Sequence, residues 1–144
     1  MTMPEFNTRT ASWDDDSTDL MQVRHIVFVE GQNVPASIES DDFDKVSWYV
    51  LAELADGKPI GCARLQPNGK VTRIAVLQEY RRLGIARQML RDIIDIADSQ
   101  NIDSLYLHAQ ITAIGLYEQF GFVQCGEQFE EAGIQHIRMT RTSD

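Results

Sequence analysis

Residues 82–99 carry apolar side chains at helical spacing directly after a stretch with the composition of β-strands. The apolar positions are Ala86, Met89, Leu90, Ile93, Ile94 and Ala97. Because they recur every three or four residues, they form one face of an amphipathic helix, and charged residues occupy the opposite face. Such a helix needs an apolar surface to cover, and the strands before it supply one. The sequence therefore predicts an α+β fold in which this helix packs on a sheet.

Three strands are expected before this helix, at residues 46–55, 60–66 and 70–76. The segments are rich in β-branched and aromatic residues, as strands are. The dipeptide Asp56-Gly57 closes the first segment, and Pro67-Asn68-Gly69 closes the second. Both are turn sequences, so the three strands are predicted to form an antiparallel meander.

Further elements are expected on either side of this unit. The acidic residues 14–16 are typical of a first helical turn, and helical spacing continues to about Val29. An acidic, irregular segment follows at 30–44. After the long helix we expect a strand at 104–109, a short helix at 112–119, and a hairpin of strands 122–129 and 135–141. The strand–helix–strand order in the middle predicts a parallel crossover and a mixed, mostly antiparallel sheet.

Size and charge narrow the classes of function. The 144 residues fit one domain, 1–144, and the formal net charge of −9 gives no broad cationic surface for nucleic acid or anionic membrane. No apolar run approaches the ~20 residues of a membrane helix, and no secretory signal is evident, so we expect a cytoplasmic protein.

Cys62 and Cys125 lie far apart and are predicted to be reduced core thiols. No ligand spacing relates the histidines and cysteines, which disfavours a metal site.

The segment with the clearest chemical pattern leads into the long helix. The free amides and the dipole of a helix N-terminus attract phosphate, and Gly84 lets an anion approach the main chain. The small Ala86 continues this clearance, and Arg81, Arg82 and Arg87 add positive charge on an otherwise acidic protein. The pattern predicts a pyrophosphate cradle. The alternative is a solvated helix start whose arginines pair with Glu79 and Asp92.

The run R-x-x-G-x-A at 81–86, together with Leu-Tyr-Glu-Gln-Phe-Gly-Phe at 116–122, resembles the GNAT superfamily of acyl-CoA-dependent N-acetyltransferases. The segments 27–35, 107–110 and 133–137 are similar to its ElaA-type subgroup. The resemblance covers nearly the whole chain. It implies a GNAT-like sheet of about seven strands with helices on both faces, in the order β-α-(α)-β-β-β-α-β-α-β-β, with one strand ahead of the first helix.

The resemblance also implies a binding site for acetyl-CoA. The amides of 82–87 would hold the pyrophosphate, the main chain of 74–76 would bind the pantetheine like an added strand, and the strand ending at Ala109 would splay away to admit it. Gln110 stands where many relatives carry an asparagine that contacts the pantetheine. The coenzyme-binding residues expected on this basis are Ile74, Ala75, Val76, Arg81, Arg82, Leu83, Gly84, Ile85, Ala86, Arg87 and Gln110.

Tyr117 falls on the position of the family's general acid, which protonates the departing thiolate. A phenol with an unperturbed pKa of about 10 is protonated at neutral pH and suits that role. The acceptor amine also needs a base, and the candidates, in order, are His108, Glu30 and His136. A structural, hydrogen-bonded imidazole is the alternative for each histidine.

The acidic loop provides a prediction about the acceptor. Glu39 and Asp41, within a run that includes Asp42 and Asp44, are expected to draw a cationic amine to the site, and His136 is expected to line it. A solvated loop on an acidic protein is the alternative.

These residues favour an N-acetyltransferase that moves an acetyl group from acetyl-CoA to a small-molecule or peptide amine by direct transfer in a ternary complex. Neither cysteine has an evident base beside it, which disfavours an acyl-enzyme. A non-catalytic acyl-CoA-binding or regulatory domain is the alternative, because the strand at 70–76 offers Lys70, Thr72 and Arg73 but no carboxylate base. Exposed edge strands make a homodimer a further expectation.

Overall fold

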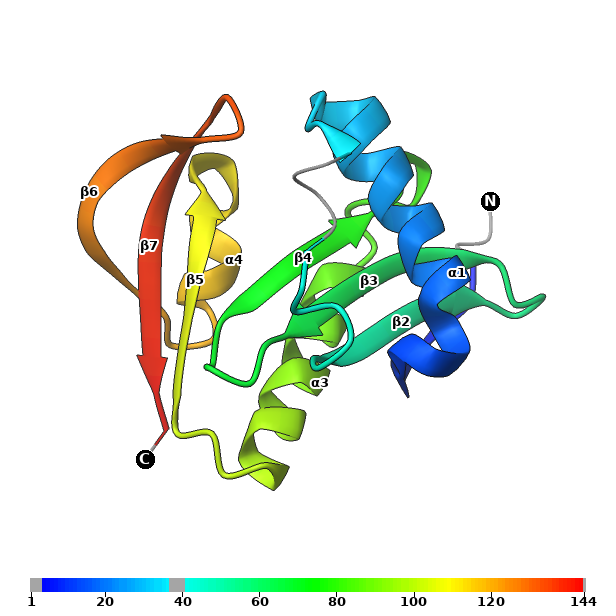
Figure 1. Cartoon of the computed structure of the whole chain (residues 1–144), viewed down its shortest axis with the longest axis horizontal. Coiled ribbons are helices and arrows are strands. Elements are labelled where there is room, and N and C mark those ends of the chain that lie inside the picture. The colour runs from blue at the N-terminus through cyan, green and yellow to red at the C-terminus, as the bar shows by residue number, and fades with distance from the viewer. Residues whose placement is uncertain (1–3, 37–40, 144) are drawn as a thin grey trace.

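The computed structural model describes residues 4–36 and 41–143, and this part of the chain contains seven strands together with helices and short helical turns. Figure 1 shows their arrangement. In chain order the elements are β1 (Phe6–Ala11), α1 (Trp13–Arg24), the π-helical turn η1 (His25–Glu30), β2 (Trp48–Leu54), β3 (Pro59–Leu65), β4 (Val71–Val76), the 3₁₀ turn η2 (Gln78–Tyr80), α3 (Ile85–Ser99), β5 (Ser104–Gln110), the 3₁₀ turn η3 (Ile111–Ala113), α4 (Ile114–Glu118), β6 (Val123–Glu131) and β7 (Ile134–Thr142).

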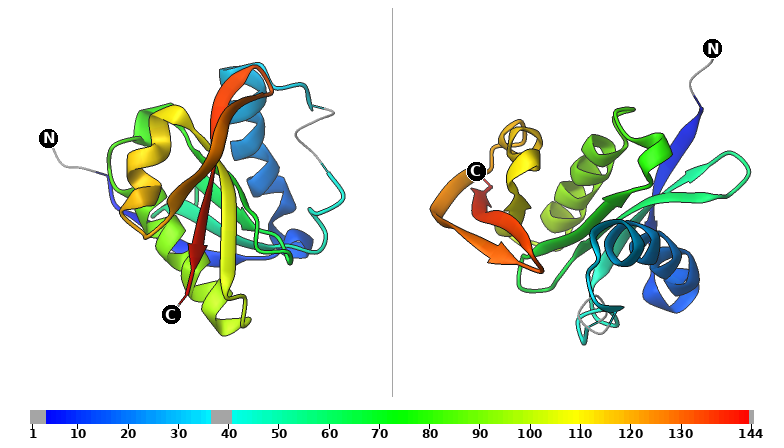
Figure 2. Two further views of the ribbon diagram at one scale, coloured as in Figure 1. Left: turned by 90° about the vertical axis from the view of Figure 1, so that its left-hand side faces the viewer. Right: turned by 90° about the horizontal axis from the view of Figure 1, so that it is seen from above.

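The strands form two antiparallel sheets rather than one continuous sheet. The first has the order β1-β2-β3-β4, and the second has the order β5-β7-β6. Helices α1 and α3 cover opposite faces of the first sheet, as the view from above in Figure 2 shows. The α+β class, the seven strands and the covering helices confirm the expected fold.

The two sheets touch at one parallel bridge in the described residues, between Lys70 and Tyr106. The backbone N–H of Tyr106 donates to the carbonyl oxygen of Gly69 at 3.1 Å. Beyond this point β4 and β5 diverge (Figure 1). The parallel relation expected for the strand–helix–strand unit is therefore present, but it is limited to a single contact.

The first helix begins slightly earlier than its acidic residues suggest. Ser12 is the N-cap, and its hydroxyl accepts the backbone N–H of Asp15 at 3.2 Å. Asp16 completes the cap by accepting the N–H of Ser12 at 3.0 Å, so the acidic residues fill the first turn. Helical structure continues through η1, which ends at Glu30, to Gln32, three residues beyond the expected end.

The apolar stripe of α3 is buried as the sequence predicts. Met89, Leu90 and Ile93 have no exposed surface, and they belong to the core formed with β2 and β3. The helix itself begins at Ile85, whereas the sequence pattern placed its start at residue 82. The difference arises because Arg82 and Gly84 both have left-handed backbones, with φ of 67° and 84°, which no α-helix accommodates.

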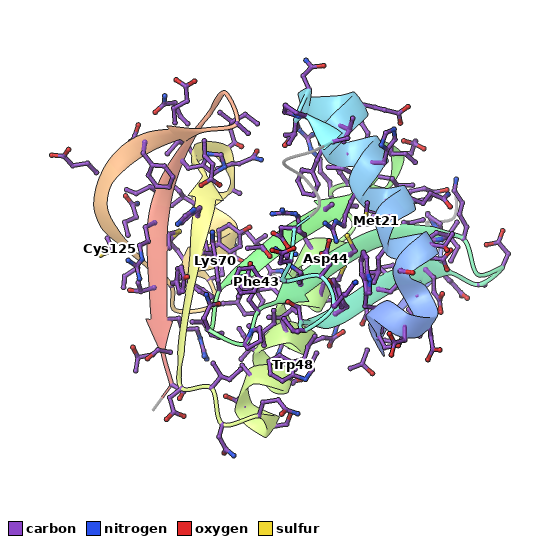
Figure 3. All side chains as sticks on the ribbon, in the orientation of Figure 1. Met21, Phe43, Asp44, Trp48, Lys70 and Cys125 are labelled. Atoms are coloured by element: carbon purple, nitrogen blue, oxygen red, sulfur yellow. The ribbon has the colours of Figure 1, made fainter. Side chains whose placement is uncertain are left out.

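One expectation about the cysteines is wrong. Cys62 is buried in β3, but Cys125 is exposed on β6 (Figure 3). Strand β6 is the edge of the second sheet, and nearly all of its residues are exposed. Its pairing with β7 shifts between Cys125 and Phe129, where Gly126 has φ of 84°. A curved edge strand without a covering layer leaves its apolar residues open to solvent.

No helix in the described residues is long and apolar enough to cross a membrane.

Candidate active site

A cavity of about 720 Å³ passes between the two sheets where β4 and β5 diverge. One end is lined by η2, the first turn of α3 and α4. The other end is lined by η1, the start of β4, His108 of β5 and the turn of the last hairpin. The cavity therefore joins the side of the molecule that carries α3 to the side that carries α1.

The end at α3 has room above the first helical turn. Gly84 lines the cavity, and a Cβ built on it would meet no atom within 4 Å. The residues expected to form the cradle, 81–87, also line the cavity, with the exception of Leu83. A free helix N-terminus under open space, with arginines beside it, is a site that fits a phosphate group.

The arginines of this turn do not pair with Glu79 and Asp92, as the alternative interpretation required. Arg81 donates through Nε to the carbonyl oxygen of Val76 at 3.0 Å, and Arg87 donates to the side-chain oxygen of Gln119, the C-cap residue of α4. The carboxylate of Asp92 instead accepts hydrogen bonds from the hydroxyl of Thr8 and the side-chain amide of Gln88. Arg81 thus fixes the turn against the end of β4, and Arg87 links α3 to α4.

The edge of β4 that borders the cavity is an open strand edge in the described chain. Ile74, Ala75 and Val76 line the cavity, and in the described residues no strand pairs with them on the side that faces β5. A β-bulge lies just before them, because the register shifts between Cys62 and Arg64 while Arg73 has φ of 55°. An open strand edge can bind an extended ligand through main-chain hydrogen bonds.

Gln110 lies at the end of β5 and lines the cavity. Its amide pairs with that of Gln32, and the shorter contact runs from Nε2 of Gln110 to Oε1 of Gln32 at 3.1 Å. This contact ties β5 to the segment after η1, so Gln110 borders the gap and helps to frame it.

Tyr117 of α4 lines the cavity from the second sheet's side. It is 9% exposed, and its ring packs edge-to-face on Phe122 with centroids 6.0 Å apart. Burial raises the pKa of the phenol to about 12, because the charged phenolate loses solvation. The side chain is therefore protonated across the neutral range.

His108 lies in the same cavity and has a carboxylate partner that the sequence did not reveal. Its Nδ1 is 2.9 Å from Oε2 of Glu131, and its ring packs edge-to-face on Phe129 at 5.0 Å. Glu131 ends β6, where the sequence indicated only a turn. The signal that could have found it is the acid that opens this turn, since hairpin pairing brings it back toward β5.

The other two base candidates are placed differently. His136 is 6% exposed and lines the cavity, and its Nδ1 lies 2.7 Å from the carbonyl oxygen of Ile134. Glu30 is exposed at the end of η1 and does not line the cavity. The structure thus brings His108 and His136 together and leaves Glu30 outside.

Two carboxylates of the acidic loop, Asp41 and Asp44, pair with arginines. Asp41 pairs with Arg64 at 2.7 Å and with Arg73 at 3.2 Å. Asp44, 4% exposed, pairs with Arg24 at 2.8 Å and with Arg64 at 2.7 Å. Neither carboxylate lines the cavity. Glu39 lies outside the described residues.

Burial alone would raise the pKa of Asp44, but the hydrogen bond and charge of Arg24 and the charge of Arg64 outweigh it. They hold the pKa of this carboxyl below its usual range. Asp44 is therefore charged at neutral pH and binds the loop before β2 to α1 and β3.

In the residues described, no three histidine, cysteine or acidic side chains gather as a metal site would require.

Comparison with known proteins agrees with this geometry. Residues 27–143 match the model of the acetyltransferase (GNAT) domain. A candidate acetyltransferase of Bacillus subtilis is 33% identical over 143 residues, 96% of this chain and 97% of that protein.

Two solved structures share the fold. An acyl-CoA N-acyltransferase from Pseudomonas aeruginosa has a TM-score of 0.85 at 26% identity, covering 96% of this chain and 100% of that one. ElaA of Escherichia coli has a TM-score of 0.83 at 24% identity, covering 94% of this chain and 99% of that one. The family model spans most of the chain, and the relatives align over nearly their full length. The chain therefore belongs to the GNAT family of N-acetyltransferases.

Proposed function

We propose that the protein transfers an acetyl group from acetyl-CoA directly to a primary amine, with both substrates bound in the one cavity. The observation that carries this proposal is the continuity of the cavity, which runs from the cradle at Gly84, past Tyr117, to His108. A donor and an acceptor that enter from opposite ends of such a passage can meet without an acyl-enzyme.

The residues of the α3 end fit acetyl-CoA. The open space at Gly84 and the free amides of the first turn suit the pyrophosphate. The unpaired edge of Ile74–Val76 suits the amide-bearing pantetheine arm, which can bind there like an additional strand. The bound thioester supplies the activated acetyl group.

Tyr117 and His108 would move the two protons of the reaction. The amine nitrogen forms a bond to the acetyl carbon while the carbon–sulfur bond breaks. The phenol of Tyr117 gives its proton to the leaving sulfur. The amine's proton goes to Nε2 of His108, which is free to accept it when Glu131 holds the proton on Nδ1.

The test is a steady-state kinetic study with acetyl-CoA and a set of amines, in which release of the coenzyme thiol is measured. Direct transfer predicts intersecting double-reciprocal lines and no acetylated cysteine in the intact-mass spectrum. Parallel lines with an acetylated Cys62 or Cys125 would contradict direct transfer. Stoichiometric binding of acetyl-CoA without turnover of any amine would instead identify a non-catalytic acyl-CoA-binding domain.

Three further expectations belong to this proposal. Residues 1–144 act as one acetyltransferase domain, and the reaction takes place in the cytoplasm. A homodimer through the exposed edge of β6 stays a prediction, and sedimentation of the purified protein would test it.

A further inference from the structure

Lys70 is the one lysine that lines the cavity, although the chain has three, the others being Lys45 and Lys58. It stands just before β4, at the bridge between the two sheets, and its position beside the gap is seen in Figure 3. The side chain is partly buried. It forms no ion pair with any residue that the structure describes. The acceptor end of the cavity therefore contains a cation that has no ion-pair partner among the described residues.

The position of Lys70 lowers the pKa of its side-chain amine. Burial lowers the pKa of its amine, and the repulsion of Arg73 adds to the effect, although Glu131 acts in the opposite direction. A partly desolvated ammonium gains from an anion that replaces its lost hydration.

The acidic side chains near this end of the cavity already have partners. Asp41 is paired with Arg64 and Arg73, and Glu131 is paired with His108. Glu131 also faces the cavity, close enough to affect Lys70 but not in contact with it. The cavity thus has a negative group on the β6 side and a positive group on the β4 side, with space between them.

We infer that the acceptor is a zwitterion of the amino-acid type, and that Lys70 binds its anionic group while the amine faces His108 and Glu131. The inference rests on the proposed acetyltransferase function and names the substrate class for it. It replaces the sequence-based expectation of a purely cationic amine, because the carboxylate of Asp41 is committed to arginines. A second ammonium on the acceptor would be repelled by Lys70.

The position of Lys70 also separates the acceptor's anion from that of the donor. Val76, at the cradle end of β4, is six residues farther along the chain, which corresponds to roughly 20 Å of extended strand. The arginines beside Gly84 therefore serve the donor's phosphates, and Lys70 remains for the acceptor.

The experiment compares matched pairs of amines as acceptors. Glycine, L-alanine, β-alanine and γ-aminobutyrate are each assayed beside the corresponding carboxamide, which keeps the amine and the shape but lacks the charge. Where Lys70 binds the carboxylate, the acid of at least one pair is favoured in kcat/KM by about tenfold or more. Carboxamides that react as well as every acid would overturn the inference.

Variants of Lys70 assign that preference to this residue. Lys70→Met is expected to lower kcat/KM for the favoured acid by about tenfold and to leave its carboxamide unaffected, while Lys70→Arg retains part of the preference. The matched control is Lys45→Met, which removes the same charge from an exposed position that does not line the cavity. Equal losses on acid and carboxamide would show that Lys70 acts through structure and would contradict the proposal.

A binding measurement keeps the inference testable even without turnover. With 13C-labelled lysine, the three lysine side chains give separate NMR signals. The signal lost in Lys70→Met belongs to Lys70, the signal lost in Lys45→Met belongs to Lys45, and the remaining signal belongs to Lys58. Addition of the acids to the complex with coenzyme A should shift the Lys70 signal and raise its pKa, whereas the carboxamides should not. No shift with any acid would overturn the inference, as would acetylation of Lys70 itself by acetyl-CoA.

Failure of the inference and failure of the proposed function are distinguishable. A protein that binds acetyl-CoA and acetylates neutral amines without preference retains the proposed function and loses the zwitterion site. A folded protein that binds no acetyl-CoA loses the proposed function, whatever the Lys70 signal does.

Discussion

Lys70 and Tyr106 pair at the one place where the two sheets touch in the described chain, and the parallel ladder goes no further. A continuous ladder would have buried the inner edges of β4 and β5. Because it stops after one bridge, no described strand pairs with Ile74, Ala75 and Val76 on the side of β5, and the cavity opens on both sides of the sheet. The active-site proposal depends on this early divergence.

The cradle predicts a specific effect of a methyl group at Gly84. Gly84→Ala is expected to weaken acetyl-CoA binding by about tenfold or more, because its Cβ would occupy the space above the helix amides. Isothermal titration calorimetry measures the change in Kd directly.

Gly57→Ala is the matched control for this change. Gly57 has φ of 89°, compared with 84° at Gly84, and its Cβ would also meet nothing within 4 Å, but it lies in the turn between β2 and β3. Both variants should lose about 1 kcal/mol of stability from backbone strain. Equal Kd values for acetyl-CoA in the two variants would place the pyrophosphate elsewhere.

The acid role predicts that Tyr117→Phe lowers kcat by about 10²-fold, with the Kd for acetyl-CoA almost unchanged. Because burial raises the pKa of the phenol to about 12, its ionisation should cause no loss of wild-type kcat between pH 7 and pH 10. Tyr106→Phe, outside the cavity lining, is the control. A Tyr117→Phe enzyme with wild-type kcat would mean that another group protonates the sulfur.

The His108–Glu131 pair predicts unequal but linked effects. His108→Gln should reduce kcat by about 10²-fold, and Glu131→Gln should cause a smaller loss because it only orients the imidazole. In the double variant the loss should match that of His108→Gln alone, since the two residues act as a unit. Glu130→Gln, at the exposed neighbouring position, should leave kcat unchanged. Additive losses would show that Glu131 acts independently of His108.

The buried arginine–aspartate network predicts a loss of stability. Asp44→Asn should lower the free energy of unfolding by about 3 kcal/mol at pH 7, because Arg24 and Arg64 lose a buried counter-charge. The exposed neighbour gives the control, since Asp42→Asn should change it by less than about 0.5 kcal/mol. Urea denaturation measures both.

The pH dependence of this loss has a defined sign. The pKa of Asp44 is lower in the folded protein than in the unfolded chain, so its contribution is present above pH ~4 and disappears as the pH falls through the folded pKa. The difference in stability between wild type and Asp44→Asn should therefore shrink in acid. A difference that stays constant down to pH 3 would contradict the assigned charge state.

The sequence predicts much of the fold because its main elements are encoded locally. The stripe of α3, the turns at Gly57 and Gly69, and the final hairpin all depend on residues close together in the chain. The exposure of Cys125 could not be predicted in this way, because it depends on which strand ends at the edge of a sheet.

The candidate site also combines features that are local in sequence with features that depend on long-range contacts. That Gly84 and its arginines line one cavity could be predicted, because they are contiguous in sequence. The pairing of His108 with Glu131, 23 residues away, depends on the register of three strands. The pairing of Asp41 with Arg64 is a long-range contact of the same kind, so the acidic run by itself does not reveal it.

The most direct test of the account is a calorimetric titration of the purified protein with acetyl-CoA, with coenzyme A and dephospho-coenzyme A as comparison ligands. The account predicts one acetyl-CoA bound per chain, with weaker binding in Gly84→Ala and unchanged binding in Gly57→Ala. A folded wild-type protein that binds none of the three ligands would contradict it.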